Sequence, residues 1–293
     1  MTLSKKNILR SIRYCIVAIW CGCIVWYAVR IFLFDQFIIP TESMVPTLWP
    51  GDRIIVDKTI FGARIYQKFD FNKDGCELVS RRTNGERKIK PNDIVVFNFP
   101  YHGGKISFVI NHVFVKRCVG VPGDSVRIID GAYKNSNHPD SIGLLQLQKR
   151  LAAIPDSEIH PRMLGAMPKT RHVPWTIKNF GPLYLPRYGD SLTLTAKEGQ
   201  IYKRVLEWET GKNISIDWEN DIVLADNEPL SWHTFKHGYY FMCGDNVTHS
   251  DDSRYWGLVP EEYIVGVATH ISYSIDPTTR KYRKDRFFKK LSQ

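Results

Sequence analysis

The sequence predicts a mainly β protein that follows one N-terminal transmembrane helix, and three observations predict this fold class. The chain has 293 residues, 43% hydrophobic and 24% charged, which is enough to bury a core and excludes a disordered or collagen-like chain. A single uncharged apolar stretch, residues 14–29, approaches the length of a membrane span. Most other apolar runs are short, rich in β-branched and aromatic residues, and separated by Gly, Pro, Asn and Asp, as is typical of strands.

Residues 14–34 are predicted to form a transmembrane signal anchor. As a helix, residues 14–29 cover roughly 24 Å, and the apolar residues 31–34 extend the span toward a hydrocarbon core of ~30 Å. The flank before this stretch contains four basic residues and no acidic residue: Lys5, Lys6, Arg10 and Arg13. The positive-inside rule therefore keeps residues 1–13 in the cytoplasm and sends the remainder across the membrane.

Two alternatives to an anchor are a cleaved secretion signal and a buried helix of a soluble domain. A cleavage site needs small residues just after the apolar run, whereas the residues that follow this run are bulky. A buried helix of a soluble domain rarely has a basic lead and no polar face. Both observations favour the anchor.

The exported part is predicted to be β-rich at both ends and less regular between them. The strand-like runs are residues 52–58, 93–99, 106–121, 124–130, 183–199, 239–246 and 263–275. Within the irregular interval, residues 131–235, a helical patch is expected at residues 196–209. The tail, residues 276–293, is strongly basic and is either a solvated end or a segment that contacts lipid phosphates.

Cysteine and histidine usage excludes metal chemistry of the common kinds. The six cysteines form no CxxC pair, so a structural zinc site is not predicted. No HExxH motif is present, which disfavours a metalloprotease. We expect no metal, no cofactor and no nucleic-acid partner.

Ser43 is the first candidate for catalysis. It lies in a short loop between Pro40 and Pro46, at the end of an apolar run, where its hydroxyl is held on a constrained backbone. A serine hydroxyl is a poor nucleophile without an adjacent base. Taken alone, a serine in such a loop is far more often a turn or capping residue.

Lys116 is the candidate base. It lies in an apolar run of the predicted strand at residues 106–121. A lysine with the ordinary pKa near ~10.4 is useless as a base at neutral pH, but burial among apolar side chains lowers that pKa by up to several units. The alternative is a lysine on an edge strand that reaches water.

Residues 242–260 form a third dense segment, in which Gly, Asp, Asn and Ser cluster before Arg254. One interpretation is a turn-rich loop held by Asp–Arg pairing. The other is a layer of supporting residues, in which Ser250 orients the base while Asp252 and Arg254 clamp the loop. The segment alone does not decide between them.

Together, and in this order, the segments resemble bacterial type I signal peptidases (leader peptidases), membrane-anchored serine endopeptidases with a Ser–Lys dyad. The family box SMxPTL corresponds to SMVPTL at residues 43–48, and a Gly-Asp pair with a hydrophobic strand follows at residues 51–56. The box KRxxGxPGD appears as KRCVGVPGD at residues 116–124. GDN occurs at residues 244–246, and SxDSRxWG occurs as SDDSRYWG at residues 250–257. Four boxes in sequence behind an anchor are far more specific than each box alone.

The resemblance implies a role for each matching residue of the dyad and of the oxyanion hole. Ser43 matches the nucleophile, and Lys116 matches the general base that takes its proton. The family's oxyanion hole pairs the backbone N–H of the nucleophile with a hydroxyl two residues earlier, here Thr41, whose extra methyl restricts its rotamers. The family often has Gly between these positions, whereas this chain has Glu42.

Other matches imply support for the dyad and recognition of the substrate. Ser250 matches the serine that hydrogen-bonds the lysine amine, and Asp252 and Arg254 match a salt-bridged supporting pair. In the family, shallow apolar pockets accept small side chains at positions −1 and −3 of the substrate. The matching substrate-binding positions here are Phe37, Ile39, Met44, Ile54, Val96, Phe114 and Val115.

The resemblance also implies an architecture and a function. It implies an all-β, barrel-like catalytic domain made of residues 35–130 and 236–275, interrupted by a β-rich, non-catalytic inserted domain at residues 131–235. The implied activity is the removal of signal peptides from secretory preproteins at the outer, periplasmic face of the bacterial plasma (inner) membrane. Its implied partners are those preproteins and membrane lipids.

Three rival functions have a basis in the sequence. A self-cleaving repressor-type peptidase on the same fold is disfavoured by the anchor, and a pilus-transfer peptidase is mildly disfavoured by the generic form of the boxes. A membrane-tethered binding protein without activity is weakened because both Ser43 and Lys116 are present.

Overall fold

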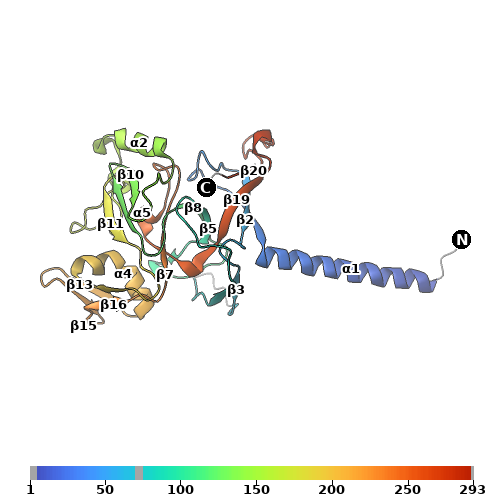
Figure 1. The fold of residues 1–293 in the computed structure, drawn as a ribbon, viewed down its shortest axis with the longest axis horizontal. Helices are drawn as coiled ribbons and strands as arrows, with labels where there is room; N and C mark the ends of the chain where they lie inside the picture. Colours follow the sequence, from blue (N-terminus) through green and yellow to red (C-terminus); the bar gives the residue numbers. More distant parts are fainter. Residues whose placement is uncertain (1–4, 70–74, 292–293) are drawn as a thin grey trace.

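A computed structural model describes residues 5–69 and 75–291, and its longest helix projects away from the globular part (Figure 1). This helix, α1 (Lys5–Phe32), contains a segment, Arg10–Phe32, that is long and apolar enough to cross a membrane and is exposed along almost its whole length. The predicted span of residues 14–34 lies within it except for the last two residues, because strand β1 begins at Phe34. Residues 1–4 of the predicted cytoplasmic segment and residues 292–293 of the tail lie outside the described residues.

The globular part is built on one antiparallel sheet of eight strands in the order β1-β2-β19-β5-β8-β17-β18, with β20 paired to β19. The strands are β1 (Phe34–Ile38), β2 (Asp52–Asp57), β5 (Ile94–Asn98), β8 (Val113–Gly120), β17 (Tyr239–Cys243), β18 (Val259–Pro260), β19 (Ile264–Ser274) and β20 (Lys289–Lys290). The strands predicted within residues 52–58, 93–99 and 263–275 are confirmed. The run at 106–121 divides into β7 (Lys105–Ile106) and β8, because residues 109–112 form a turn.

The alternation of apolar side chains along the strands supplies two buried clusters, one on each face of the sheet. On β5, Ile94 and Val96 enter a cluster with Ile39 and Met44, whereas the neighbouring Val95 and Phe97 enter the larger cluster. Successive strand residues point to opposite faces, so a continuous apolar run indicates a strand buried on both sides. Strand β5 is therefore at the centre of the molecule.

Residues 131–235 combine small sheets with three helices. Their elements are β10 (Ala132–Asn135), α2 (Leu145–Ala153), α3 (Pro161–Leu164), β11 (Phe180–Tyr184), β12 (Ser191–Thr193), α4 (Ala196–Thr210), β13 (Ile214–Asp217), β14 (Ile222–Ala225), β15 (Glu228–Pro229) and β16 (Trp232–Thr234). Helix α4 confirms the predicted helical patch: Thr195 caps its first turn, and Gly211, with a φ of 69°, ends it in the left-handed conformation. Helices α2 and α3 were not predicted.

The remaining short elements connect these parts. Strand β9 (Ser125–Ile129) pairs with both β10 and β11, and two hairpins and a single helical turn complete the fold: β3 (Arg64–Tyr66) with β4 (Ser80–Arg82), β6 (Tyr101–His102) with β7, and α5 (Ser253–Trp256). The larger buried cluster contains Val119 and Phe241 of the main sheet together with Leu183 and Leu206 of the interval 131–235. The two segments thus share one continuous apolar core.

Candidate active site

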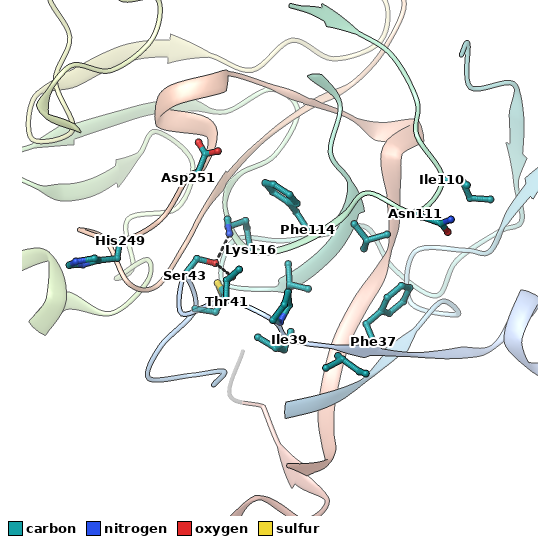
Figure 2. A pocket seen from close by; sticks show the side chains of 15 residues that line it. Phe37, Ile39, Thr41, Ser43, Ile110, Asn111, Phe114, Lys116, His249 and Asp251 are labelled. Carbon is teal, nitrogen blue, oxygen red and sulfur yellow. Dashed lines mark hydrogen bonds between the residues drawn. The ribbon is translucent and has the colours of Figure 1, made fainter. Parts of the chain in front are cut away.

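Ser43 and Lys116 meet at one end of an apolar pocket (Figure 2). The Nζ atom of Lys116 lies 2.7 Å from the Oγ atom of Ser43, which is hydrogen-bond distance. Ser43 comes from the loop that follows β1, and Lys116 comes from the middle of β8, 73 residues later. The structure therefore brings together the two residues that the sequence proposes as nucleophile and base.

The surroundings of Lys116 favour the uncharged amine. Lys116 is only 4% exposed, although in the described part of the chain residues 113–116 of β8 pair with β5 alone. Burial lowers the pKa of Lys116 below its ordinary value of 10.5, against the opposing effect of the nearby carboxylates of Asp252 and Asp251. Lys116 does lie where β8 has an unpaired edge in the described structure, but its side chain is buried, so the alternative of a lysine that reaches water is wrong.

Several contacts hold the loop that carries Ser43. The backbone N–H of Asn246 donates to the carbonyl oxygen of Ser43 at 3.1 Å, and the Nδ2 atom of Asn246 donates to the carbonyl oxygen of Glu42 at 3.2 Å. Further along, the hydroxyl of Thr47 donates to the carboxylate of Asp245. That carboxylate also pairs with Arg117, whose Nε and Nη2 atoms each lie 2.7 Å from one of its oxygens.

Arg117, Asp245 and Thr47 thus form a chain of contacts from the strand of the base to the loop of the nucleophile. Both members of the Arg117–Asp245 pair are buried. All three residues stand in the recognised boxes, yet the sequence suggested no role for them, because a charged residue in a box does not show which partner it faces.

The predicted oxyanion donor is also near the nucleophile. The Oγ1 atom of Thr41 lies 3.4 Å from the Oγ atom of Ser43. Among the described residues, the backbone N–H of Ser43 donates no hydrogen bond. A hydroxyl and an N–H are therefore both available beside the attacking oxygen, which is the arrangement that an oxyanion hole needs.

The predicted salt bridge between Asp252 and Arg254 is present and fully buried. The Nε and Nη2 atoms of Arg254 each lie 2.8 Å from an oxygen of Asp252, and both side chains are 0% exposed. The backbone N–H of Gly244 donates to the same carboxylate at 2.9 Å. Burial opposes ionisation, but the charge of Arg254 and these hydrogen bonds outweigh it and lower the pKa of Asp252.

Ser250 does not hydrogen-bond the lysine amine in the part of the chain that the structure describes. Its buried Oγ atom lies close to Gly244: a Cβ atom added to Gly244 would lie 2.1 Å from Ser250 Oγ and 2.4 Å from the carbonyl oxygen of Ser43. Gly244 is therefore required for this close approach. Ser250 lies beside the dyad without being joined to Lys116.

The pocket beside the dyad has a volume of about 670 Å³ and a largely apolar wall. Five of the seven predicted substrate-binding residues line it: Phe37, Ile39, Met44, Phe114 and Val115. The other two, Ile54 and Val96, are 0% exposed and belong to the buried cluster beneath the wall, because their side chains point into the sheet core. The sequence did not identify seven further lining residues: Ile38, Pro40, Ile110, Asn111, Val113, His249 and Asp251.

The pocket lies between two unpaired strand edges. Strand β1 is the first strand of the sheet, and its partner β2 lies on one side only. In β8, pairing to β17 begins at Arg117, so that within the described chain residues 113–116 pair with β5 alone. Backbone donors and acceptors of both segments therefore remain available to an extended chain in the pocket.

No arrangement that suits a metal ion occurs in residues 5–69 and 75–291. No three side chains of His, Cys, Asp or Glu converge there in a manner that could hold one. His249 reaches the pocket wall, but its Nδ1 atom hydrogen-bonds the hydroxyl of Thr248 at 2.9 Å.

The chain is similar to known signal peptidases in sequence. A signal peptidase I of Buchnera aphidicola (subsp. Acyrthosiphon pisum) is 29% identical over 87% of this chain and 73% of its own length. A signal peptidase I of Haemophilus influenzae is 29% identical over 89% of this chain and 71% of its own length. A crystal structure of a signal peptidase I from Enterococcus faecalis, 21% identical, covers 62% of this chain and 97% of that one with a TM-score of 0.30, at which the superposition supports no inference.

The family model described as "Signal peptidase, peptidase S26" matches residues 12–171 and 189–273, which is most of the chain. Both residues of the close Ser43–Lys116 pair fall within the matched regions. The chain therefore belongs to the signal peptidase family of serine peptidases, peptidase S26.

Proposed function

We propose that this protein is a membrane-anchored serine endopeptidase that removes N-terminal signal peptides from exported precursors, with Ser43 as nucleophile and Lys116 as general base. The observation that carries the proposal is the 2.7 Å separation of Lys116 Nζ and Ser43 Oγ at the end of an apolar pocket. Burial lowers the pKa of Lys116, which is the direction that a general base requires.

Each step of the reaction has a group in place. Lys116 accepts the proton of the Ser43 hydroxyl as Oγ attacks the scissile carbonyl carbon. The backbone N–H of Ser43 and the hydroxyl of Thr41 donate to the oxyanion that forms. The Lys116 ammonium then protonates the leaving amine of the substrate. The neutral Lys116 amine that results afterwards takes a proton from the water that hydrolyses the acyl-enzyme.

The two open strand edges suit an extended substrate. A peptide that lies between β1 and residues 113–116 gains main-chain hydrogen bonds on both sides. Alternate side chains of such a peptide point toward the wall formed by Ile39, Met44 and Val115. This wall supports selection of small side chains at positions −1 and −3.

The anchor supports an active site close to the outer face of the plasma membrane. Ser43 follows the end of α1 by 11 residues, so even a fully extended chain keeps it within ~40 Å of that end. A precursor whose own apolar segment occupies the same bilayer meets the enzyme in one plane, which raises its effective concentration. We place the N-terminus in the cytoplasm and the globular part outside the plasma membrane of a bacterial cell, on the periplasmic side.

We assign no catalytic role to residues 131–235. None of the residues that line the pocket comes from this interval. The catalytic part then consists of residues 35–130 and 236–275, as the sequence predicts.

The test is cleavage of a precursor by the full chain in detergent. A precursor with Ala at −3 and −1 should be cut after the −1 residue, as mass spectrometry of the released N-terminus would report, and Ser43→Ala enzyme serves as the blank. Changing the −1 Ala to Phe should lower kcat/KM by about a hundredfold, because the added ring overfills the pocket. Equal cleavage of both substrates, or cleavage that survives in the blank, would contradict the proposal.

Histidine substitutions separate this mechanism from a Ser–His scheme. We expect His249→Ala and His112→Ala each to retain kcat/KM within about threefold of the wild type, since neither imidazole contacts Ser43 in the described structure. Initial rates on the same precursor measure this. A loss of about a hundredfold or more in either variant would transfer the role of base to histidine.

A further inference from the structure

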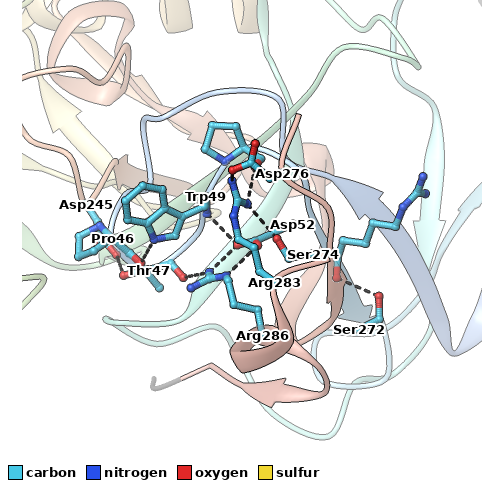
Figure 3. A network of polar contacts seen from close by, with 12 residues as sticks. Pro46, Thr47, Trp49, Asp52, Asp245, Ser272, Ser274, Asp276, Arg283 and Arg286 are labelled. Carbon is cyan, nitrogen blue, oxygen red and sulfur yellow. Dashed lines mark hydrogen bonds and ion pairs between the residues drawn. The ribbon is translucent and has the colours of Figure 1, made fainter. Parts of the chain in front are cut away.

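The C-terminal segment, residues 276–291, turns two arginines inward onto the loop that carries the nucleophile (Figure 3). Arg286 is buried and places its Nε and Nη2 atoms 2.8 Å and 2.5 Å from the two oxygens of Asp52, which is also buried. The same Nη2 atom donates to the carbonyl oxygen of Thr47 at 2.9 Å. One guanidinium thus binds both ends of the loop between Thr47 and Asp52.

Arg283 makes a second attachment from the same segment. Its Nη1 atom donates to the carbonyl oxygen of Pro50 at 2.8 Å and to the hydroxyl of Ser274 at 2.9 Å, and its Nη2 atom lies 2.8 Å from Asp276. The Asp52 carboxylate in turn accepts from the backbone N–H of Trp49 at 2.7 Å. The loop after Ser43 is therefore also held by residues from the opposite end of the chain.

The outer face of this segment has a different character. Tyr282, Phe287 and Phe288 are 59%, 47% and 74% exposed, and the rings of Tyr282 and Phe287 pack against each other at 5.7 Å. Asp285 is the one exposed acidic side chain of residues 276–291. The same segment has five exposed cations: Arg280, Lys281, Lys284, Lys289 and Lys290. Exposed rings among cations are typical of a surface that meets the headgroups of a membrane.

The segment also lies on the side of the globular part from which the membrane helix leaves. Strand β20 pairs with β19, β19 pairs with β2, and β2 pairs with β1, which begins two residues after α1 ends. In Figure 1 the red segment near β20 lies at the right edge of the globular part, the edge from which α1 projects.

We propose that residues 276–291 form a strap that docks on an anionic lipid surface and thereby stabilises the loop that carries Ser43. The proposal rests on the proposed function of the Ser43–Lys116 pair. The exposed cations match the charge of anionic headgroups, and the exposed rings insert at the same level. Docking restrains the strap, and Arg283 and Arg286 transmit that restraint to the loop, because each binds a loop carbonyl directly.

The experiment compares the full chain in two kinds of proteoliposome, one of phosphatidylcholine and one in which about 30% is replaced by phosphatidylglycerol. The substrate is a short, soluble, uncharged peptide that spans an Ala-x-Ala site, so that its own partition into the bilayer does not change. We expect kcat/KM to be about fivefold or more higher in the anionic vesicles, and this gain to vanish in about 0.5 M salt. Equal rates in the two vesicles would overturn the proposal.

A matched pair of variants assigns the gain to the strap. Replacing Lys281, Lys284, Lys289 and Lys290 by Gln should leave the rate in phosphatidylcholine unchanged and remove the gain from anionic lipid. Replacing four exposed lysines of the interval 131–235 by Gln removes the same charge and should keep the gain: Lys134, Lys149, Lys197 and Lys212. Retention of the gain in the strap variant would overturn the proposal, as would an equal gain from inorganic phosphate, which would make the ligand a soluble anion.

Hydrogen exchange separates docking from transmission. Anionic lipid should protect the amides of residues 280–290 equally in wild type and in Arg286→Lys, whereas the rate gain should be lost in the variant, since lysine lacks the planar fork that spans Asp52 and Thr47. If this variant does not fold, Arg283→Gln tests the same step through Pro50. A full rate gain in either folded variant would contradict transmission. Failure of the proposed function would give a different result: in neither kind of vesicle would the Ser43→Ala substitution reduce cleavage.

Discussion

Replacing Lys116 by Met should lower kcat/KM for precursor cleavage by at least about a thousandfold while the globular part becomes more stable. The side chain keeps its length but loses the amine that lies 2.7 Å from Ser43 Oγ, so the hydroxyl has no base. A lysine that is 4% exposed also opposes folding, because its ammonium must lose its proton or its hydration. Initial cleavage rates and urea unfolding of the solubilised protein measure the two effects.

The pH dependence of the wild type gives the same prediction a direction. Since burial lowers the pKa of Lys116 in the folded protein, activity should rise as pH increases through that lowered pKa. Between the lowered pKa and 10.5, the unfolded chain binds more protons than the folded chain, so the free energy of unfolding also rises with pH. Lys116→Met should remove this part of the slope.

The control is Lys134→Met on an exposed site of β10, which should change neither rate nor slope. Processing that persists in Lys116→Met would remove the dyad from the mechanism. A stability loss of more than about 1 kcal/mol would contradict the view that the buried amine is a burden on the fold.

Replacing Asp252 by Ala should destabilise the globular part by about 3–5 kcal/mol. The change leaves the guanidinium of Arg254, which is 0% exposed, without its carboxylate partner. It also removes the acceptor of the Gly244 N–H, at the point where Gly244 contacts Ser43 and Ser250. Urea midpoints of the single variants and of Asp252→Asn combined with Arg254→Met measure the effect, and the double variant should be more stable than Asp252→Ala.

The contribution of Asp252 depends on pH in the acidic range. Its pKa is lower in the folded protein than in the unfolded chain, so its stabilising effect is complete above the ordinary carboxyl pKa and is lost as pH falls through the lowered value. Asp217, whose side chain is partly exposed, provides the control, because Asp217→Ala leaves no buried charge behind. A cost below about 1 kcal/mol for Asp252→Ala would show that water reaches Arg254 when the carboxylate is gone.

Local sequence patterns were sufficient for several strands, whereas Ser43 and Lys116 were paired only through the resemblance of their boxes to a known family. Strands β2, β5 and β19 are bounded by turn residues and alternate in the expected way, and helix α4 has a capping Thr195 and a terminal Gly211. The burial of Lys116 was beyond such patterns. It depends on the pairing of β8 with β5 and on the approach of the loop of Ser43, which lies 73 residues from Lys116 in the chain.

The errors have the same origin. Ile54 and Val96 stand in apolar strands next to true pocket residues, and only the register of β2 and β5 decides that their side chains enter the core. Ser250 stands in the recognised box, but its buried hydroxyl lies close to Gly244 and does not hydrogen-bond the amine of Lys116 in the described structure. The basic tail was predicted as solvated or lipid-bound, and no local pattern indicated that Arg283 and Arg286 point inward.

The two unpaired strand edges, of β1 and of β8, bear on the range of proteins that such an enzyme would bind. Amide groups are identical in every polypeptide, so docking through them is indifferent to most of the passing sequence. Discrimination between substrates then depends on the one or two substrate side chains that contact the pocket wall. A single enzyme of this fold can therefore bind many precursors whose sequences are otherwise unrelated.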